Sequence, residues 1–107
     1  MSHKISNEEV LKHVRGTLSR QPFSALLKTE AIHASADGTC EFRLAINDNL
    51  MQHLGMVHGG VLGYAADTGL TFAAGIAYGA PVITSEFKIN FLRPVVGQAL
   101  IARGQVV

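Results

Sequence analysis

The sequence predicts an α+β fold in which an antiparallel sheet wraps around one long helix, and three observations predict it. Residues 59–77 form a nearly apolar stretch with helical spacing and many small side chains. Residues 39–47 alternate between apolar and polar side chains, as do residues 83–91. One largely buried helix together with alternating strands is typical of a layered fold around a single core.

The composition of the 107-residue chain fits a single domain, residues 1–107. Hydrophobic residues make up 48% and charged residues 16%, which argues against intrinsic disorder. A net charge of +1 argues against a nucleic-acid partner or a membrane-surface partner. Residues 68–85 carry no charge, but Gly69, Gly75 and Pro81 interrupt them, so we expect no transmembrane helix. With one cysteine and no secretory signal, we expect a cytoplasmic protein.

The N-terminal residues predict a short amphipathic helix. Ser6 and Glu9 have the spacing of a capping box, with Ser6 as the N-cap. Apolar residues then recur at helical spacing, including Val14 and Leu18, until Gln21-Pro22 ends the helix.

A β-hairpin is expected next, with strands over about residues 25–35 and 39–47. Asp37-Gly38 between them is a strong turn signal. In the second strand Cys40 falls on the apolar side, which predicts a small core residue rather than a reactive thiol.

The central helix should run from about Gly59 to Ala77 and end at Gly79-Ala-Pro81. Its many alanines and glycines would let the sheet pack closely against it. The alternation at residues 83–91 predicts a strand, and a last strand is expected over about 98–107.

Asp67 is the residue that points most clearly to chemistry, because it is the only fully charged side chain in the predicted helix. At 100° per residue, an apolar row that includes Gly69 forms one face of this helix. Tyr64 and Thr71 share the opposite face with Asp67. A carboxylate in such surroundings is costly unless it is paired or used. It could therefore partner a buried cation, face solvent at the rim of an oligomer, or take part in catalysis.

Two glycines stand where this helix should begin. Unpaired N–H groups and the positive end of the helix dipole are available there to a polarised carbonyl. Gly59 and Gly60 would also let a ligand approach the main chain closely. With Asp67 two turns further on, the set suits attack on a carbonyl, in which backbone donors hold the oxyanion and the carboxylate acts as base or nucleophile.

The run Gln52-x5-His58-Gly59-Gly60-x6-Asp67 resembles the signature of hotdog-fold acyl-CoA thioesterases. The likeness is greatest to the PaaI-type (phenylacetate-pathway) and 4-hydroxybenzoyl-CoA groups. The segment 85–94 is similar to the strand that follows the central helix in that family, and the resemblance extends from about Ser6 to the C-terminus. Members usually continue for further strands, so the resemblance implies a hotdog domain that lacks the last strands of the family.

The resemblance implies hydrolysis of an aryl or medium-chain acyl-CoA to the free acid and CoA. It also implies a homodimer or homotetramer with active sites at the subunit interface. The backbone N–H of Gly59 would polarise the thioester carbonyl, and Asp67 of a neighbouring subunit would activate water or attack directly. Gln52 would position the carbonyl or the water, and Thr71 would orient the water.

Further residues are expected to bind substrate or support the site. The resemblance implies that His58 mainly supports the loop before the central helix. The expected substrate-binding residues are His58, Gly60, Tyr64, Thr84 and Arg93. For the CoA phosphates the basic candidates are Arg93, Lys88 and Arg103, and for the acyl pocket the candidates are Met56, Tyr64, Phe72, Phe87 and Phe91. The only cofactor expected is the CoA of the substrate, and no metal is expected because His53 and His58 lack a third ligand at suitable spacing.

Other function classes remain open from the sequence. A hotdog hydratase typically pairs its aspartate with a histidine five positions on, and this chain has Phe72 there. A non-catalytic acyl-CoA-binding module, or an inactive truncated thioesterase, is the alternative that the short C-terminus favours. Asp67 and Gln52 favour the enzyme.

Overall fold

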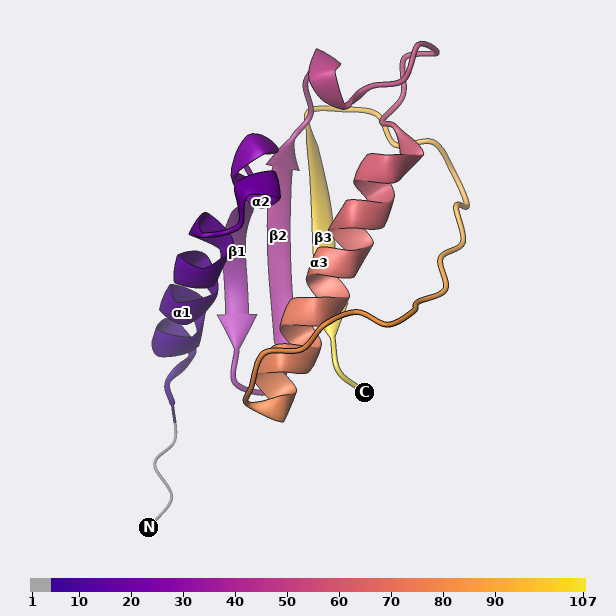
Figure 1. Ribbon diagram of the computed structural model, residues 1–107. Helices are drawn as coiled ribbons and strands as arrows, with labels where there is room; N and C mark the ends of the chain where they lie inside the picture. The colour runs from indigo at the N-terminus through magenta and orange to yellow at the C-terminus, as the bar shows by residue number, and fades with distance from the viewer. Residues whose placement is uncertain (1–4) are drawn as a thin grey trace.

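The computed structural model describes residues 5–107 as an α+β fold with a three-stranded antiparallel sheet in the order β1-β2-β3 (Figure 1). Its elements in chain order are α1 (Asn7–Ser19), α2 (Pro22–Leu26), β1 (Glu30–Ser35), β2 (Thr39–Ala45), a 3₁₀ turn (Asp48–Leu50), α3 (Gly59–Tyr78) and β3 (Ala99–Gln105). One buried cluster contains side chains of α1, α3 and the inner face of β1 and β2, so both long helices cover the same face of the sheet. The predicted fold class is confirmed.

The first helix begins at the predicted cap. The Ser6 hydroxyl accepts the backbone N–H of Glu9 at 3.2 Å, and the Glu9 carboxylate lies 3.3 Å from the same hydroxyl. Val10, Val14 and Leu18 are the buried residues of α1, and they recur at intervals of four. This row places α1 against β1 on the inner side of the sheet.

The first strand is shorter than the sequence predicts, and the expectation of strand structure at residues 25–29 is wrong. Pro22 occupies the first turn of α2, where its fixed φ and missing N–H favour a helix start. The chain leaves α2 through Lys28, whose φ of 55° is left-handed, and Thr29 donates its N–H to the carbonyl of Ser24 at 3.0 Å. Strand pairing therefore begins only at Glu30, opposite Arg43.

The turn between β1 and β2 confirms the predicted hairpin. Gly38 has a φ of 92°, which glycine adopts at little cost. The Asp37 carboxylate accepts the Ser35 hydroxyl and, at 3.1 Å, the Thr39 N–H. These hydrogen bonds, chiefly the one from Ser35, lower the pKa of the Asp37 carboxyl below its usual value. The charged form of Asp37 thus helps to fix the register that pairs Ser35 with Thr39.

The closest contact between helix and sheet joins two glycines. A Cβ atom at Gly104 in β3 would lie 2.1 Å from the carbonyl oxygen of Gly69 in α3, which no real side chain tolerates. The thiol of Cys40 in β2 is fully buried beside them and donates to the same carbonyl at 3.4 Å. Burial raises the pKa of this thiol, as expected for a core cysteine. Phe42 and Phe72 extend the contact, with ring centroids 5.2 Å apart.

The segment 81–98 passes along the outer side of α3 and contains no strand, so the predicted strand at 83–91 is wrong (Figure 1). Its alternating sequence has the pattern of a strand, but a strand also needs a neighbour for its N–H and C=O groups. Within residues 5–107, the sheet ends at β3 and no strand lies beside this segment. The expected last strand does form, at Ala99–Gln105.

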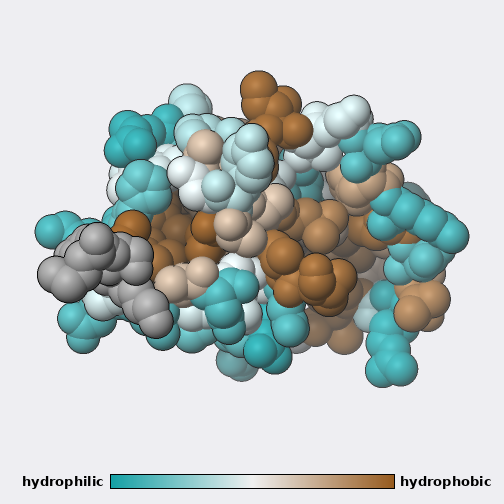
Figure 2. All heavy atoms as spheres, turned by 90° about the horizontal axis from the view of Figure 1, so that it is seen from below, coloured by the Kyte–Doolittle hydropathy of each residue, from teal (hydrophilic) through white to brown (hydrophobic). Residues whose placement is uncertain are grey.

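The outer face of the sheet carries two ion pairs, Glu30 with Arg43 at 3.7 Å and Glu41 with Arg103 at 3.5 Å. Hydrophobic side chains nevertheless reach the surface elsewhere, as the view from below shows (Figure 2). Several lie on the segment 81–98, namely Ile83, Phe87, Phe91, Leu92 and Val96. In the part of the chain that the structure describes, no helix is both long and apolar enough to cross a membrane.

Candidate active site

Asp67 lies at the centre of a cluster of two hydroxyl groups. The Thr71 hydroxyl donates to Asp67 Oδ1 at 3.1 Å from one helical turn further on, and the Thr84 hydroxyl reaches the same oxygen from the segment 81–98. The two hydroxyl oxygens are 2.9 Å apart. The three close contacts share two hydroxyl protons. Together they hold the segment 81–98 against α3.

The arrangement leaves the second oxygen of the carboxylate available for chemistry. Both hydroxyls contact Oδ1, so Oδ2 is free of these donors. Among residues 5–107 the only ion pairs are Glu30–Arg43 and Glu41–Arg103, and neither involves Asp67. Asp67 is only partly buried. The carboxylate is thus oriented by hydroxyls, while one oxygen keeps its lone pairs for a water or a carbonyl carbon.

The first turn of α3 has one N–H group that no described residue accepts. His58 is the N-cap, and its Nδ1 accepts the N–H of Gly60 at 2.8 Å. The N–H of Val61 reaches the His58 carbonyl at 2.9 Å, and the N–H of His58 reaches the carbonyl of Leu50 at 2.9 Å. In the described part of the chain this leaves only the N–H of Gly59 without an acceptor in that turn. Such a donor at a helix N-terminus can bind a carbonyl oxygen that gains negative charge.

Gly59 and Gly60 differ in how much space a side chain would have at each position. A Cβ at Gly60 would lie 3.1 Å from His58 Nδ1 and 3.3 Å from its Cε1, so a side chain there would press on the capping imidazole. A Cβ at Gly59 would meet only Phe91, whose Cε1 atom would be 3.9 Å away, an ordinary contact. The helix cap therefore explains the glycine at 60, while no residue among 5–107 would crowd a side chain at 59.

Gly59 and Asp67 cannot act on the same carbonyl within one chain. They are eight residues apart on a continuous helix, which corresponds to about 12 Å along its axis. A carbonyl oxygen bound at the Gly59 N–H would thus lie beyond reach of the Asp67 carboxylate of the same chain. Within a single chain these two groups therefore cannot form one site.

Gln52 is held in place by hydrogen bonds within the loop before α3. Gln52 exchanges backbone contacts with the loop, donating its N–H to the Met56 carbonyl at 2.8 Å and accepting the Gly55 N–H at 3.2 Å. Its side-chain Oε1 accepts the N–H of Leu54 at 3.1 Å, which leaves the amide NH₂ as the donating end. A bridge between Met51 and Val57 closes the loop next to the helix cap.

Tyr64 does not join Asp67, although both lie on the predicted polar side of the helix. Its hydroxyl contacts the hydroxyls of Thr29 and Ser24 at 2.7 Å each, and its ring lies edge-on to Phe23. The buried Ser24 hydroxyl in turn donates to Gln21 Oε1 at 2.8 Å. In the structure this tyrosine connects α2 and the residue before β1 to α3.

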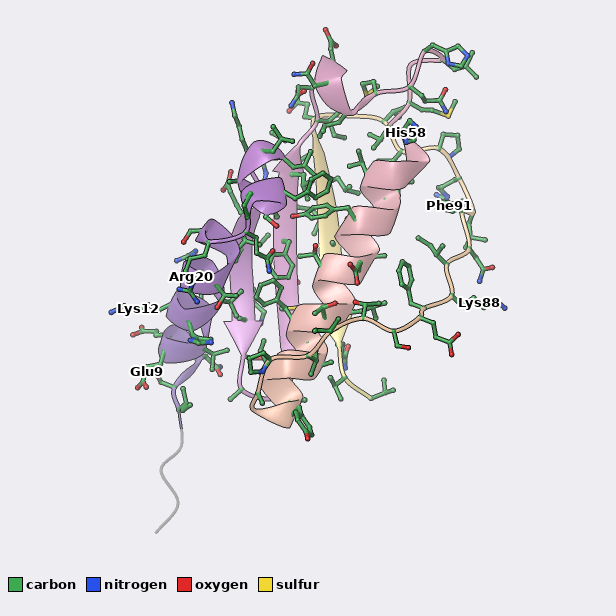
Figure 3. The ribbon with its side chains drawn as sticks, in the orientation of Figure 1. Glu9, Lys12, Arg20, His58, Lys88 and Phe91 are labelled. Atoms are coloured by element: carbon green, nitrogen blue, oxygen red, sulfur yellow. The ribbon has the colours of Figure 1, made fainter. Side chains whose placement is uncertain are left out.

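The basic residues considered for CoA phosphates are in different situations. Lys88 and Arg93 are exposed on the segment 81–98, where Lys88 points away from α3 (Figure 3). Arg103 is on β3 and pairs with Glu41. No group of three or more histidine, cysteine or acidic residues that could hold a metal ion occurs in residues 5–107.

Two features of the site could not be found from the sequence pattern. The first is the contact of Thr84 with Asp67, and the second is the position of Phe91 beside Gly59. Both depend on the path of the segment 81–98, which returns along α3 from its C-terminal to its N-terminal end (Figure 3). The family resemblance had marked Thr84 as a substrate-binding residue and Phe91 as a pocket candidate, but it did not indicate either contact.

The long helix α3 packed on one face of an antiparallel sheet is the arrangement of a hotdog fold. A family model described as the thioesterase superfamily matches residues 54–107, which include α3, the segment 81–98 and β3. This match covers half of the chain. The chain therefore belongs to the thioesterase superfamily. Comparison with curated proteins gave no significant match.

Solved structures support the hotdog fold of PaaI-type thioesterases. The PaaI protein of the Escherichia coli phenylacetic acid degradation operon superposes with a TM-score of 0.80 at 20% identity, covering 92% of this chain and 71% of that one. A thioesterase family protein from Silicibacter pomeroyi gives 0.76 at 27% identity, over 88% and 70%. Zebrafish thioesterase superfamily member 2 gives 0.70 at 20% identity, over 92% and 72%.

Proposed function

We propose that this protein hydrolyses acyl-CoA thioesters, releasing a free acid and CoA at sites shared between two copies of the chain. The observation that carries the proposal is the unaccepted N–H of Gly59 at the start of the same helix that presents Asp67. A glycine without a steric reason in its own chain leaves room for a thioester carbonyl to reach this N–H. Membership of the thioesterase superfamily supports the reaction type.

Two routes to hydrolysis are compatible with these residues. In the first, Asp67 takes a proton from a water that attacks the carbonyl carbon, and the Gly59 N–H stabilises the oxyanion. The C–S bond then breaks, and the CoA thiolate leaves with the proton that Asp67 had taken. In the second, the carboxylate attacks the carbonyl, CoA leaves as a thiolate that takes up a proton, and water cleaves the resulting anhydride. In both routes Thr71 and Thr84 orient the carboxylate, and the Gln52 amide donates to the carbonyl or to the water.

The shared site follows from the separation of its two halves. About 12 Å of helix lies between Gly59 and Asp67, so the carboxylate that serves one Gly59 belongs to the second copy. The segment 81–98 carries exposed apolar side chains and, at 83–91, a strand-like sequence. Pairing of this segment with the second copy would bury those side chains and supply the missing backbone partners. We expect a homodimer, or a homotetramer built from such dimers.

The direct test measures release of free CoA thiol from a panel of aryl and straight-chain acyl-CoA esters. We expect activity in the wild-type protein, and we expect Asp67→Asn to lower kcat by about 10²- to 10⁴-fold, because the amide cannot act as base or nucleophile. Asp48→Asn is the matched control, since Asp48 is an exposed aspartate in the 3₁₀ turn. Binding of acyl-CoA without release of CoA from the wild type would instead support a non-catalytic module.

A complementation experiment tests the shared site itself. Asp67→Asn keeps an intact Gly59, whereas Gly59→Pro keeps an intact Asp67 and removes only the N–H of its first helical residue. Dissociating and reassociating an equal mixture should restore about a quarter of the wild-type rate, because half of the dimers are then mixed and each holds one complete site. No recovery in a mixture shown to contain mixed dimers would contradict the shared site.

A further inference from the structure

Within residues 5–107 the sheet has two outer strands, β1 and β3, and side chains of a helix bind the backbone at only one of them. In Figure 1, α1 runs along β1, while β3 lies on the side of the segment 81–98. An outer strand has backbone N–H and C=O groups that its single neighbour does not bind. A strand of another chain can pair with these groups unless something covers them.

Two side chains of α1 bind backbone groups at the two ends of β1. Near the start of the strand, Arg15 Nε donates to the carbonyl oxygen of Ala31 at 3.0 Å. At the other end, Asn7 Oδ1 accepts the N–H of Ala36, the residue that follows the strand, at 3.0 Å. A strand added along the whole of this edge would need the same carbonyl and the same N–H. The two contacts therefore occupy groups that an added strand would bind.

A bulge makes the same edge irregular. Ala31 pairs with Phe42 and His33 pairs with Glu41, which leaves Ile32 as the extra residue of β1. The Ile32 side chain is 39% exposed. Bulges bend and twist a strand, and they are one of the devices that keep the edges of sheets from pairing. The helix side chains and the bulge thus act on the same strand.

We propose that the free edge of β1 is a surface that can pair with β1 of a second copy, and that Arg15 and Asn7 close it. With this edge closed, association of the chain is directed to the other side of the sheet. The β1 edge lies on the side of the sheet opposite the segment 81–98 (Figure 1). The inference therefore does not rest on the proposed function or on its shared site.

The sequence of β1 is compatible with pairing to itself. In an antiparallel pair of two β1 strands with a two-fold axis at the middle of the strand, Glu30 faces Ser35 and Ala31 faces Ala34. No two carboxylates then lie opposite each other, so like charges do not oppose this register. The main-chain hydrogen bonds of such a pair would hold the two copies together once the edge is open.

The test opens the edge and measures the mass of the protein in solution. Asn7→Ala/Arg15→Met removes both contacts without changing β1. We expect sedimentation velocity to show its mass rising with concentration toward about twice the wild-type value. Arg20→Met is the matched control, because Arg20 carries the same charge and its guanidinium donates to Thr17 of its own helix, at 3.4 Å. This control should keep the mass of the wild type.

Three further measurements show whether the association uses β1. Hydrogen exchange of the backbone amides of residues 30–36 should become slower as the opened variant associates. Ile32→Lys in the opened variant places a charge on the exposed bulge, and it should restore the wild-type mass. Asn7→Asp keeps an acceptor oxygen at position 7. Combined with Arg15→Met, it should therefore associate less than Asn7→Ala does.

A folded Asn7→Ala/Arg15→Met variant that keeps the wild-type mass at every concentration overturns the inference. Equal association of Arg20→Met also overturns it, and so does association that Ile32→Lys does not reverse. Far-ultraviolet circular dichroism checks that each variant is folded. If the double variant does not fold, Arg15→Met alone takes its place, because it keeps the Asn7 contact and opens only the start of the strand. The same outcomes then decide.

Discussion

Two places on α3 use glycine for opposite reasons. In the middle of the helix, Gly69 faces Gly104 of β3 so closely that a Cβ at Gly104 would collide with the Gly69 backbone. At the N-terminus, a Cβ at Gly59 would find only one ordinary contact. The first glycine pair is required by the packing of this chain on itself. The second position is open, since no residue among 5–107 is close enough there to require a glycine.

Among changes to these glycines, the largest expected effect comes from removing the N–H at the open position. Gly59 is the first residue of α3, where proline is well accepted, and His58 before it is extended with φ −61° and ψ 136°, as a residue preceding proline should be. Gly59→Pro should therefore keep the helix and lower kcat by about 10²- to 10³-fold, the usual cost of one oxyanion donor. Gly59→Ala keeps the N–H and should lose much less activity.

Rates of CoA release and far-ultraviolet circular dichroism check this prediction together. A folded Gly59→Pro variant with nearly wild-type kcat would show that this N–H does not stabilise the oxyanion.

The next effect concerns the packed position and is one of stability. Gly104→Ala must displace the Gly69 backbone, which should lower the free energy of unfolding by about 3 kcal/mol. Gly16→Ala is the matched control, because at this half-buried position of α1 its Cβ would meet only the flexible side chain of Arg20, at 3.7 Å. That change should raise stability by about 0.5–1 kcal/mol. Denaturant unfolding of both variants checks the opposite signs, and equal effects would contradict the distinction between the two kinds of glycine.

A smaller effect is expected at Gly60, which lies between these extremes. An alanine there presses on the His58 imidazole and weakens the cap, at a cost of about 1 kcal/mol. Alanine also gains up to about 1 kcal/mol over glycine in a helix. We expect a net change within about 1 kcal/mol in denaturant unfolding. A loss as large as that of Gly104→Ala would mean that Gly60 is packed against backbone rather than against a movable ring.

The smallest effect lies outside α3, in the β1–β2 turn, and is seen only in acid. Hydrogen bonds from Ser35 and Thr39 lower the pKa of Asp37 below its usual value of 3.8. A depressed pKa stabilises the fold above the unfolded-state pKa, and this contribution is lost as the pH falls through the lower folded-state value. We expect Tm to fall below about pH 4, and less steeply in Asp37→Asn. Identical acid profiles for both proteins would contradict this role.

Much of the fold could be predicted because its signals are local. The Ser6 cap, the Asp37-Gly38 turn and the start of α3 at Gly59 each depend on residues a few positions apart. The prediction of a strand from residue 25 failed because the helix start at Pro22 outweighed a weak alternation. The prediction at 83–91 failed for a different reason, since alternation cannot reveal whether a neighbouring strand is present.

For the candidate site, too, the sequence predicted some features and missed others. The motif identified Gly59 and Asp67, and the spacing on a helix already fixes how far apart they lie. It could not show that Thr84 contacts Asp67, that Tyr64 turns toward α2, or that Phe91 passes Gly59. Those contacts join residues distant in sequence.

The sequence by itself thus determined a long helix with a carboxylate inside it, an open glycine at its start and a hairpin beside it. Local backbone preferences, capping and periodicity are short-range, so they can be read from the order of residues. Only the tertiary structure decided that the Thr84 hydroxyl reaches the carboxylate, because the path of residues 81–98 along α3 is fixed by contacts between distant parts of the chain.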